Sequence, residues 1–211
     1  GPRREYGRLR DGRGRRGRTF YSPKVAGLYM TVAFPAGLAA ENALGVTAYA
    51  AVCVAGAVER LTGKDARIKW VNDLYLDGKK ICGILTEAVT DFESGALEAL
   101  LVGVGVNLRP VPLPAPLAET VGFLSCDKPL KNPLAAAIAE ALLRYPPADT
   151  AYLAAYRKRS MTLGRNVLWT QGDRSGTGRA EAIDESGALV VRGADGALQV
   201  LKSGEITLLP D

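Results

Sequence analysis

The dipeptide Asp77-Gly78 constrains the fold most, because it separates two runs of strand-forming residues. The run before it is ARIKWVNDLYL and the run after it is KKICGILTEAVT, and both carry β-branched or aromatic residues typical of strands. A type I′ turn requires positive φ at both central residues, which aspartate and glycine tolerate. The sequence therefore predicts a β-hairpin at this point of the chain.

Further strands and a long helix are predicted on both sides of this hairpin. The runs GLYMTVAF (27–34) and LEALLVGVGVNL (97–108) are typical of strands. The stretch from Glu41 to Leu61 is rich in alanine and valine, and Gly63 follows it, which predicts a buried helix with a glycine stop. The small residues of this helix favour close packing against a sheet.

Two shorter helices are predicted in the second half of the chain. Asn132 as N-cap and Pro133 in the first turn predict a helix that runs to about Arg144. Another helix is expected from Thr150 to Arg159.

The texture of the sequence changes near Leu163. Five short strand-forming runs follow: NVLWTQ, GRAEAID, ALVVRG, ALQVLK and EITLL. Short strands at close spacing, several of them separated by the turns DESG and ADG, predict a small β-barrel. The chain is therefore expected to be an α+β protein with two domains, residues 1–162 and 163–211.

Composition excludes several classes of protein. Of the 211 residues, 47% are hydrophobic and 23% charged, which is typical of a soluble globular protein. Histidine is absent, which excludes Ser-His-Asp and Cys-His triads and most zinc enzymes. Three scattered cysteines predict reduced thiols. No apolar run reaches the roughly 18 residues of a membrane span and no signal peptide is recognisable, so we expect a cytoplasmic protein without a membrane partner.

The segment GRGRRGR (Gly12–Arg18) concentrates positive charge near the N-terminus. Residues 1–24 hold eight arginines and Lys24 against Glu5 and Asp11, a charge of +7, which leaves about −2 for the rest of a chain whose formal charge is +5. Glycines let backbone amides approach a ligand, and arginine forks suit phosphate or carboxylate. By itself the segment fits a ligand loop, an arm for RNA or DNA, or a solvated tail.

Polar residues end the strands around the hairpin. KWVND (Lys69–Asp73), here called the strand-end segment, offers a lysine for phosphate, an Asn-Asp pair for a polar ligand or metal-bound water, and a tryptophan to wall a flat ligand; a satisfied Asn-Asp turn is the alternative. Strand alternation places Lys80 opposite Ile81, on the face of Cys82, unless Lys80 is simply solvated. GVGVN (103–107) is a glycine-bared strand, for which tight packing under a helix is the alternative.

In this order, GRGRRGR, SPKVAGLY, KWVNDLYLDGKKICGIL, VGVGVNL and a barrel ending in GEITL resemble the biotin protein ligases over nearly the whole chain. The resemblance implies a mixed β-sheet packed with helices, as in class II aminoacyl-tRNA synthetases, and an SH3-like C-terminal barrel. It implies that ATP, with Mg²⁺, activates biotin to biotinyl-5′-AMP and releases pyrophosphate. Biotin then passes to a lysine of a biotin carboxyl carrier protein. The related lipoate ligases usually lack this Arg/Gly loop.

The resemblance also implies roles for individual residues. Lys80, Arg15 and Asp73 are expected to be catalytic, with Lys80 contacting the biotin carboxylate and the α-phosphate. The expected ligand-binding residues are Gly12, Arg13, Gly14, Arg16 and Gly17 in a loop that closes over the adenylate, Phe20 on the adenine, Lys69 and Asn72 near the phosphates, Gly83, Gly103 and Gly105 along the biotin slot, and Asn107 near the ribose. No protein residue is assigned as a metal ligand.

The sequence also departs from the family pattern. Nothing in Gly1–Asp11 matches the strand, helix and Ser-Thr-Asn motif that normally precede the Arg/Gly loop. The chain is therefore expected to be either a fragment or a weak or inactive remnant that only binds adenylate or carrier. A helix-turn-helix domain is missing too, so we expect no operator DNA binding. Val71 stands where proline is common, and the resemblance allows a homodimer through the main sheet.

Overall fold

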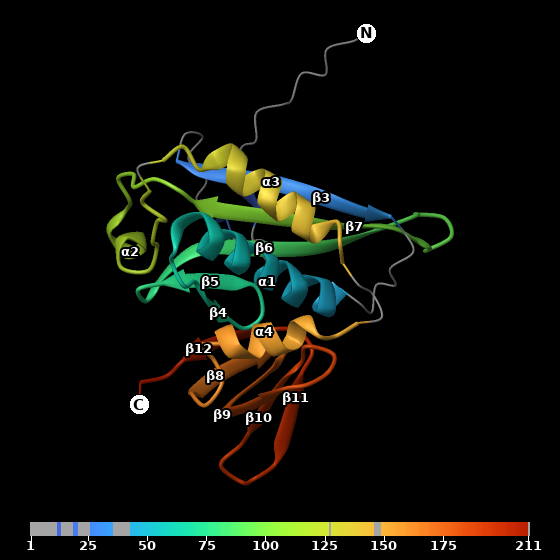
Figure 1. The fold of residues 1–211 in the computed structure, drawn as a ribbon. Helices are drawn as coiled ribbons and strands as arrows, with labels where there is room; N and C mark the ends of the chain where they lie inside the picture. The colour runs from blue at the N-terminus through green and yellow to red at the C-terminus, as the bar shows by residue number, and fades with distance from the viewer. Residues whose placement is uncertain are drawn as a thin grey trace.

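The computed structural model describes residues 26–35, 43–126, 128–145 and 149–210, and of residues 12–13 and 19–20 the backbone alone. The described strands form two five-stranded sheets and a two-stranded ladder. Helices lie against the first five-stranded sheet, and the second sheet lies beside them (Figure 1). The α+β class predicted from the sequence is confirmed.

The main sheet contains five strands in the order β3-β7-β6-β5-β4. Their bounds are Gly27–Pro35 for β3, Arg67–Lys69 for β4, Asp73–Leu76 for β5, Lys79–Thr90 for β6 and Leu97–Asn107 for β7. Every ladder between them is antiparallel, so the expectation of a mixed sheet is wrong for the described strands. Short connections join β4 to β5, β5 to β6 and β6 to β7, and only antiparallel strands can be joined in this way.

The predicted hairpin between β5 and β6 is confirmed. Asp77 has φ of 50° and Gly78 has φ of 75°, as a type I′ turn requires. Two adjacent residues determine this turn, so the sequence alone was enough to locate it.

Helices α1 (Ala43–Thr62) and α3 (Lys131–Leu142) cover one face of the main sheet, as Figure 1 shows. The stop of α1 is as predicted, because Gly63 has φ of 71° and its N–H bonds Glu59 O at 2.7 Å. The N-cap of α3 is Leu130, not Asn132, because the N–H of Leu134 already closes a helical turn onto Leu130 O.

Helix α1 is long and apolar enough to cross a membrane by length and composition alone, although no such run was expected from the sequence. In the structure 56% of its most apolar window is buried inside the molecule. Its alanines and valines pack against the sheet and against α3 and α4 (Tyr152–Arg159), as those of a core helix do. A further described helix, α2 (Ala115–Ala118), is a single short turn.

The C-terminal sheet has the order β11-β10-β9-β8-β12 and is antiparallel throughout its described strands. Its strands are β8 (Asn166–Gln171), β9 (Arg174–Ile183), β10 (Leu189–Arg192), β11 (Leu198–Leu201) and β12 (Glu205–Leu208). They match the five predicted runs, and the unit is the small SH3-like barrel that was expected. One continuous core joins it to the main sheet through α4 (Figure 1).

Candidate active site

The face of the main sheet opposite α1 carries a row of residues that crosses all five strands. Lys69 pairs with Asp73, Asp73 with Gly83, Gly83 with Gly105, and Gly105 with Tyr29. Paired residues of antiparallel strands point to the same face. Segments distant in the sequence therefore meet on one surface, here called the open face.

Glycines leave the middle of the open face without side chains. Gly103 lies one row from Gly105 and pairs with Thr31 on one side and Leu85 on the other. Among the described residues, a Cβ built on Gly103 would meet only Leu85, its O at 3.6 Å and its Cβ at 3.9 Å, which are ordinary contacts. Neighbouring protein atoms therefore do not require glycine at position 103, and its effect is to keep space above the sheet.

An ion pair lies beside the glycine floor, the name used here for Gly83, Gly103 and Gly105, because Asp73 pairs with Gly83. Lys80 Nζ lies 2.7 Å from Asp73 Oδ1, and the two side chains remain 31% and 21% exposed. Both groups are thus close to solvent and within reach of a ligand on the open face. The two residues predicted to be catalytic and described in the structure are therefore in contact.

A β-bulge decides which way Lys80 points. The register shifts so that Tyr75 pairs with Lys80 and Leu74 with Cys82, which leaves Ile81 without a partner in the ladder. Lys80 therefore shares a face with Asp73, while Cys82 is fully buried on the opposite, helix-covered face. The expectation that Lys80 and Cys82 share a face is wrong for this reason. Burial, followed by the charge of Asp73, raises the pKa of the Cys82 thiol.

A strap formed by residues 119–124 holds the backbone of Lys80. The N–H of Lys80 donates to Thr120 O, and Lys80 O accepts from the N–H of Gly122, each at 2.8 Å. Asn107 is 7% exposed, and its Nδ2 donates to Gly122 O at 3.1 Å and to Lys80 O at 3.4 Å. Asn107 thus ties the end of β7 to the strap and to Lys80, while its predicted place near the ribose stays a prediction.

Two regions of the chain match models of known protein families. The model of the biotin/lipoate A/B protein ligase family matches residues 8–107, and the biotin protein ligase C-terminal domain matches residues 162–209. The biotin–[acetyl-CoA-carboxylase] ligase of Paracoccus denitrificans is 32% identical over 212 residues, covering 92% of this chain and 85% of that protein. The chain belongs to the biotin protein ligase family.

Other members of the family are similar over most of the chain. The bifunctional ligase/repressor BirA of Escherichia coli is 29% identical over 93% of this chain, which spans only 63% of that relative's length. A solved biotin protein ligase of Aquifex aeolicus, in complex with biotin and ATP, has a TM-score of 0.78 at 24% identity and covers 95% of this chain and 85% of its own. That of Leishmania major with biotinyl-5-AMP has a TM-score of 0.55 at 26% identity, with coverages of 90% and 84%.

In this member of the family, Asn72 ties the strand-end segment to β6. Asn72 Nδ2 donates to Ile84 O at 2.6 Å, and Asn72 O accepts from the N–H of Ile84 at 2.9 Å. Lys69 Nζ lies 5.8 Å from the centre of the Tyr75 ring. Burial, followed by the charge of Asp73, raises the pKa of Tyr75 to about 12, so its hydroxyl stays protonated at neutral pH.

Trp70 does not wall a ligand, contrary to one role considered for it. Its side chain is 3% exposed, and its Nε1–H donates to Gly187 O in the turn between β9 and β10 at 3.0 Å. The residue lies between the main sheet and the barrel, where no ligand on the open face can touch it. Trp70 and Gly187 lie 117 positions apart in the sequence, so no local signal revealed this placement.

The Arg/Gly loop is described only at its base. The backbones of Gly12–Arg13 (β1) and Thr19–Phe20 (β2) pair as an antiparallel ladder, Gly12 with Phe20 and Arg13 with Thr19. The side chains of Arg13 and Phe20, and Gly14, Arg15, Arg16 and Gly17 altogether, lie outside the described residues, so their roles stay predictions. Within the described part of the chain, no three His, Cys, Asp or Glu side chains are grouped so that they could hold a metal ion.

Proposed function

We propose that the protein is an ATP-dependent biotin protein ligase. It joins biotin to the α-phosphate of ATP, releases pyrophosphate, and transfers biotin from biotinyl-5′-AMP to a lysine of a biotin carboxyl carrier protein. The observation that carries this proposal is the Lys80–Asp73 pair at 2.7 Å beside a floor of glycines on the open face. Relatives whose structures hold biotin with ATP, or biotinyl-5-AMP, support the choice of substrates.

Electrostatics explain why a lysine belongs at this position. The biotin carboxylate must attack a phosphate that is also negative, and repulsion between two anions is strong where water is scarce. A fixed ammonium group lowers the energy of the charge that develops in the transition state. Lys80 supplies this group, and Arg13 and Arg15 of the loop are proposed to supply more. None of these roles needs histidine, which the chain lacks.

The glycine floor is suited to a flat ligand that lies on the sheet. Gly83, Gly103 and Gly105 expose backbone where other strands carry side chains, so biotin can approach the sheet closely. Lys69 ends β4, Asp73 begins β5 and Asn72 lies between them, on the side where the phosphates are proposed to lie. The reacting carboxylate would then meet the α-phosphate next to Lys80.

Magnesium is proposed to arrive with ATP rather than to reside in the protein. Mg²⁺ commonly binds through one or two carboxylates together with substrate phosphates. Asp73 is a carboxylate on the open face, and it is the residue that would approach such an ion. When bound, the ion would neutralise charge on the polyphosphate. Because the described residues contain no larger carboxylate group, they fit only this shared arrangement.

Biotin-dependent exchange of labelled pyrophosphate into ATP tests the first half of the proposal. Exchange that requires biotin would support adenylate formation, and appearance of avidin-reactive carrier protein would support the transfer. The alternative is a remnant that only binds adenylate or carrier. Absence of exchange at saturating biotin, with biotin binding retained by calorimetry, would favour that remnant.

The domain boundary, the oligomeric state, DNA binding and the location of the protein are also predicted. We place the domain boundary near Leu163, and the C-terminal family model that begins at residue 162 supports it. The predictions of a homodimer, of no operator DNA binding and of a cytoplasmic location stay predictions. The chain matches only 63% of the length of the Escherichia coli relative, which is named as both a ligase and a repressor.

A further inference from the structure

The strand-end segment is held from behind by residues that occur 85 to 117 positions later. The backbone N–H of Trp70 donates to Thr162 Oγ1 at 3.0 Å. Tyr156 Oη donates to Val71 O at 3.0 Å, and the Trp70 indole donates to Gly187 O at the same distance. We call Tyr156, Thr162 and Gly187 the clamp.

Burial makes these three hydrogen bonds hard to replace. Tyr156 and Thr162 are 0% exposed, and Trp70 and Val71 are each 3% exposed. Water therefore cannot satisfy a group that loses its partner, and the backbone must move or leave a polar atom unpaired. Each bond thus restricts where the strand-end segment can lie.

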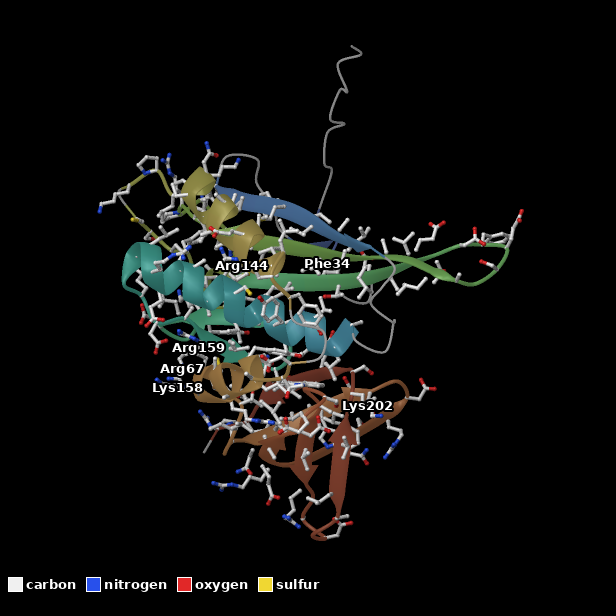
Figure 2. All side chains as sticks on the ribbon, turned by 45° about the vertical axis from the view of Figure 1, so that its right-hand side comes forward. Phe34, Arg67, Arg144, Lys158, Arg159 and Lys202 are labelled. Carbon is white, nitrogen blue, oxygen red and sulfur yellow. The ribbon has the colours of Figure 1, made fainter. Side chains whose placement is uncertain are left out.

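The strand that leads into the segment is fixed from the same side. Ile68 O accepts from the N–H of Met161 at 2.9 Å. Arg67 Nε donates to Arg159 O at 3.2 Å and its Nη2 to Ser160 O at 3.3 Å, at the end of α4. Figure 2 shows Arg67 beside Lys158 and Arg159 where β4 meets α4. The clamp therefore continues a chain of contacts along β4.

The turn that carries Gly187 is itself well determined. Asp184 Oδ1 accepts from the N–H groups of Ser186 at 2.8 Å and Ala188 at 2.9 Å. Gly187 has φ of 85°, a conformation that favours glycine. The barrel thus presents a fixed carbonyl to the Trp70 indole.

We propose that the clamp positions the strand-end segment for adenylate formation, which gives the barrel and α4 a role in the first half-reaction. This inference rests on the proposed function. The clamp touches the segment on the side away from the open face, so Tyr156 and Thr162 are positioning residues, not catalytic ones. They act through Trp70 and Val71, which lie three and two residues before Asp73, and Asp73 pairs with Lys80.

Tyr156→Phe removes one clamp hydrogen bond and keeps the ring. We expect kcat for biotin-dependent pyrophosphate exchange to fall by about 10-fold to 100-fold, because small misplacements of reacting groups have effects of this size. The KM for biotin should change little, because the clamp hydrogen bonds go to Trp70 and Val71 and not to the glycines of β6 and β7. Tyr49→Phe is the matched control, since it removes the Tyr49 Oη to Ala141 O bond of 2.8 Å elsewhere in the core; its kcat should equal that of the parent.

Thr162 allows a second, paired test. Thr162→Ser keeps the acceptor for the Trp70 N–H, whereas Thr162→Val keeps the shape and removes the acceptor. We expect Ser to retain kcat and Val to lose it, in protein shown by urea unfolding to be folded under assay conditions. Amide hydrogen exchange at residues 69–73 should quicken in Thr162→Val and not in Thr162→Ser.

The outcomes separate the clamp from the proposed function. If the parent protein exchanges pyrophosphate and Tyr156→Phe and Thr162→Val match its kcat, the clamp inference is overturned. If the parent shows no biotin-dependent exchange, the proposed function fails, and amide exchange alone judges the clamp. Faster exchange at residues 69–73 in Thr162→Val would then support a clamp on the segment, and unchanged exchange would refute it.

Discussion

At the scale of single residues, glycine on the open face separates function from packing. Gly103 has no positive φ, and no neighbour in the described part of the chain lies so close that a methyl group would strike it. A glycine inside a strand weakens the strand, because glycine has more conformational freedom to lose on folding than other residues have. A residue that costs stability and that packing does not require points to a ligand above it.

Gly103→Ala should therefore have opposite effects on stability and on binding. We expect the free energy of unfolding to stay the same or to rise by up to about 1 kcal/mol. Biotin binding should weaken about tenfold or more, because a methyl group in a fitted site costs roughly 1–3 kcal/mol. Urea unfolding and calorimetry measure the two quantities.

The control for this substitution is Gly56→Ala in α1, where an added Cβ meets no atom of the described residues within 4 Å. It should raise stability by about 1 kcal/mol and leave biotin affinity unchanged. Equal biotin affinity in Gly103→Ala and the parent would contradict a ligand site over this part of the sheet.

At the scale of elements, the strap of residues 119–124 explains the bulge in β6. It bonds the backbone of Lys80 on both sides, through Thr120 O and the N–H of Gly122. A Cβ on Gly122 would lie 2.8 Å from Lys79 Cβ and 3.2 Å from Ile81 Cγ2. Glycine at position 122 is thus required by packing, unlike glycine at position 103.

Gly122→Ala should displace the strap from β6. We expect a loss of roughly 1–3 kcal/mol in the free energy of unfolding, as for other overpacked sites. Pyrophosphate exchange should fall further than the folded fraction does, because Lys80 moves with the strap. The comparison with Gly103→Ala by urea unfolding is decisive: similar stabilities for the two variants would mean that the strap does not press on β6.

How far the sequence predicted these elements depends on the distance over which each is determined. The Asp77-Gly78 turn, the stop of α1 at Gly63 and the five barrel strands follow from neighbouring residues and were predicted. The bulge at Ile81 depends on a strap about forty residues away, and strand alternation alone placed Cys82 on the wrong face. The clamp was missed for the same reason, because Tyr156 and Thr162 carry no local mark of what they contact.

At the scale of the whole molecule, one core holds sheet, helices and barrel together, and it contains ionisable groups kept neutral by burial. Burial raises the pKa of the Cys53 thiol from 9.0 to about 11. Burial, followed by the neighbouring Cys53, raises that of Tyr49 from 10.0 to about 12. The unfolded chain releases these protons at lower pH than the folded chain does, so stability present below about pH 9 is lost as pH rises towards 11.

Alkaline pH should therefore weaken the fold before the thiols ionise in the native state. Between pH 8 and pH 10 we expect Cys53 alone to lower the free energy of unfolding by about 1 kcal/mol. Urea unfolding at the two pH values measures the difference, and Cys53→Ala should reduce it. An unfolding free energy that is equal at pH 8 and pH 10 would show that burial does not hold the Cys53 pKa high.

The proposed function depends most on the pairing of Lys80 with Asp73 on the open face, and the adjacent Lys79 provides the control. Lys79 is an exposed lysine whose Nζ donates to Ala118 O at 2.9 Å. Biotin-dependent pyrophosphate exchange should fall about 100-fold or more in Lys80→Ala, as when a transition-state donor is removed, and should stay near the parent rate in Lys79→Ala. Exchange at the parent rate in a folded Lys80→Ala protein would contradict the account.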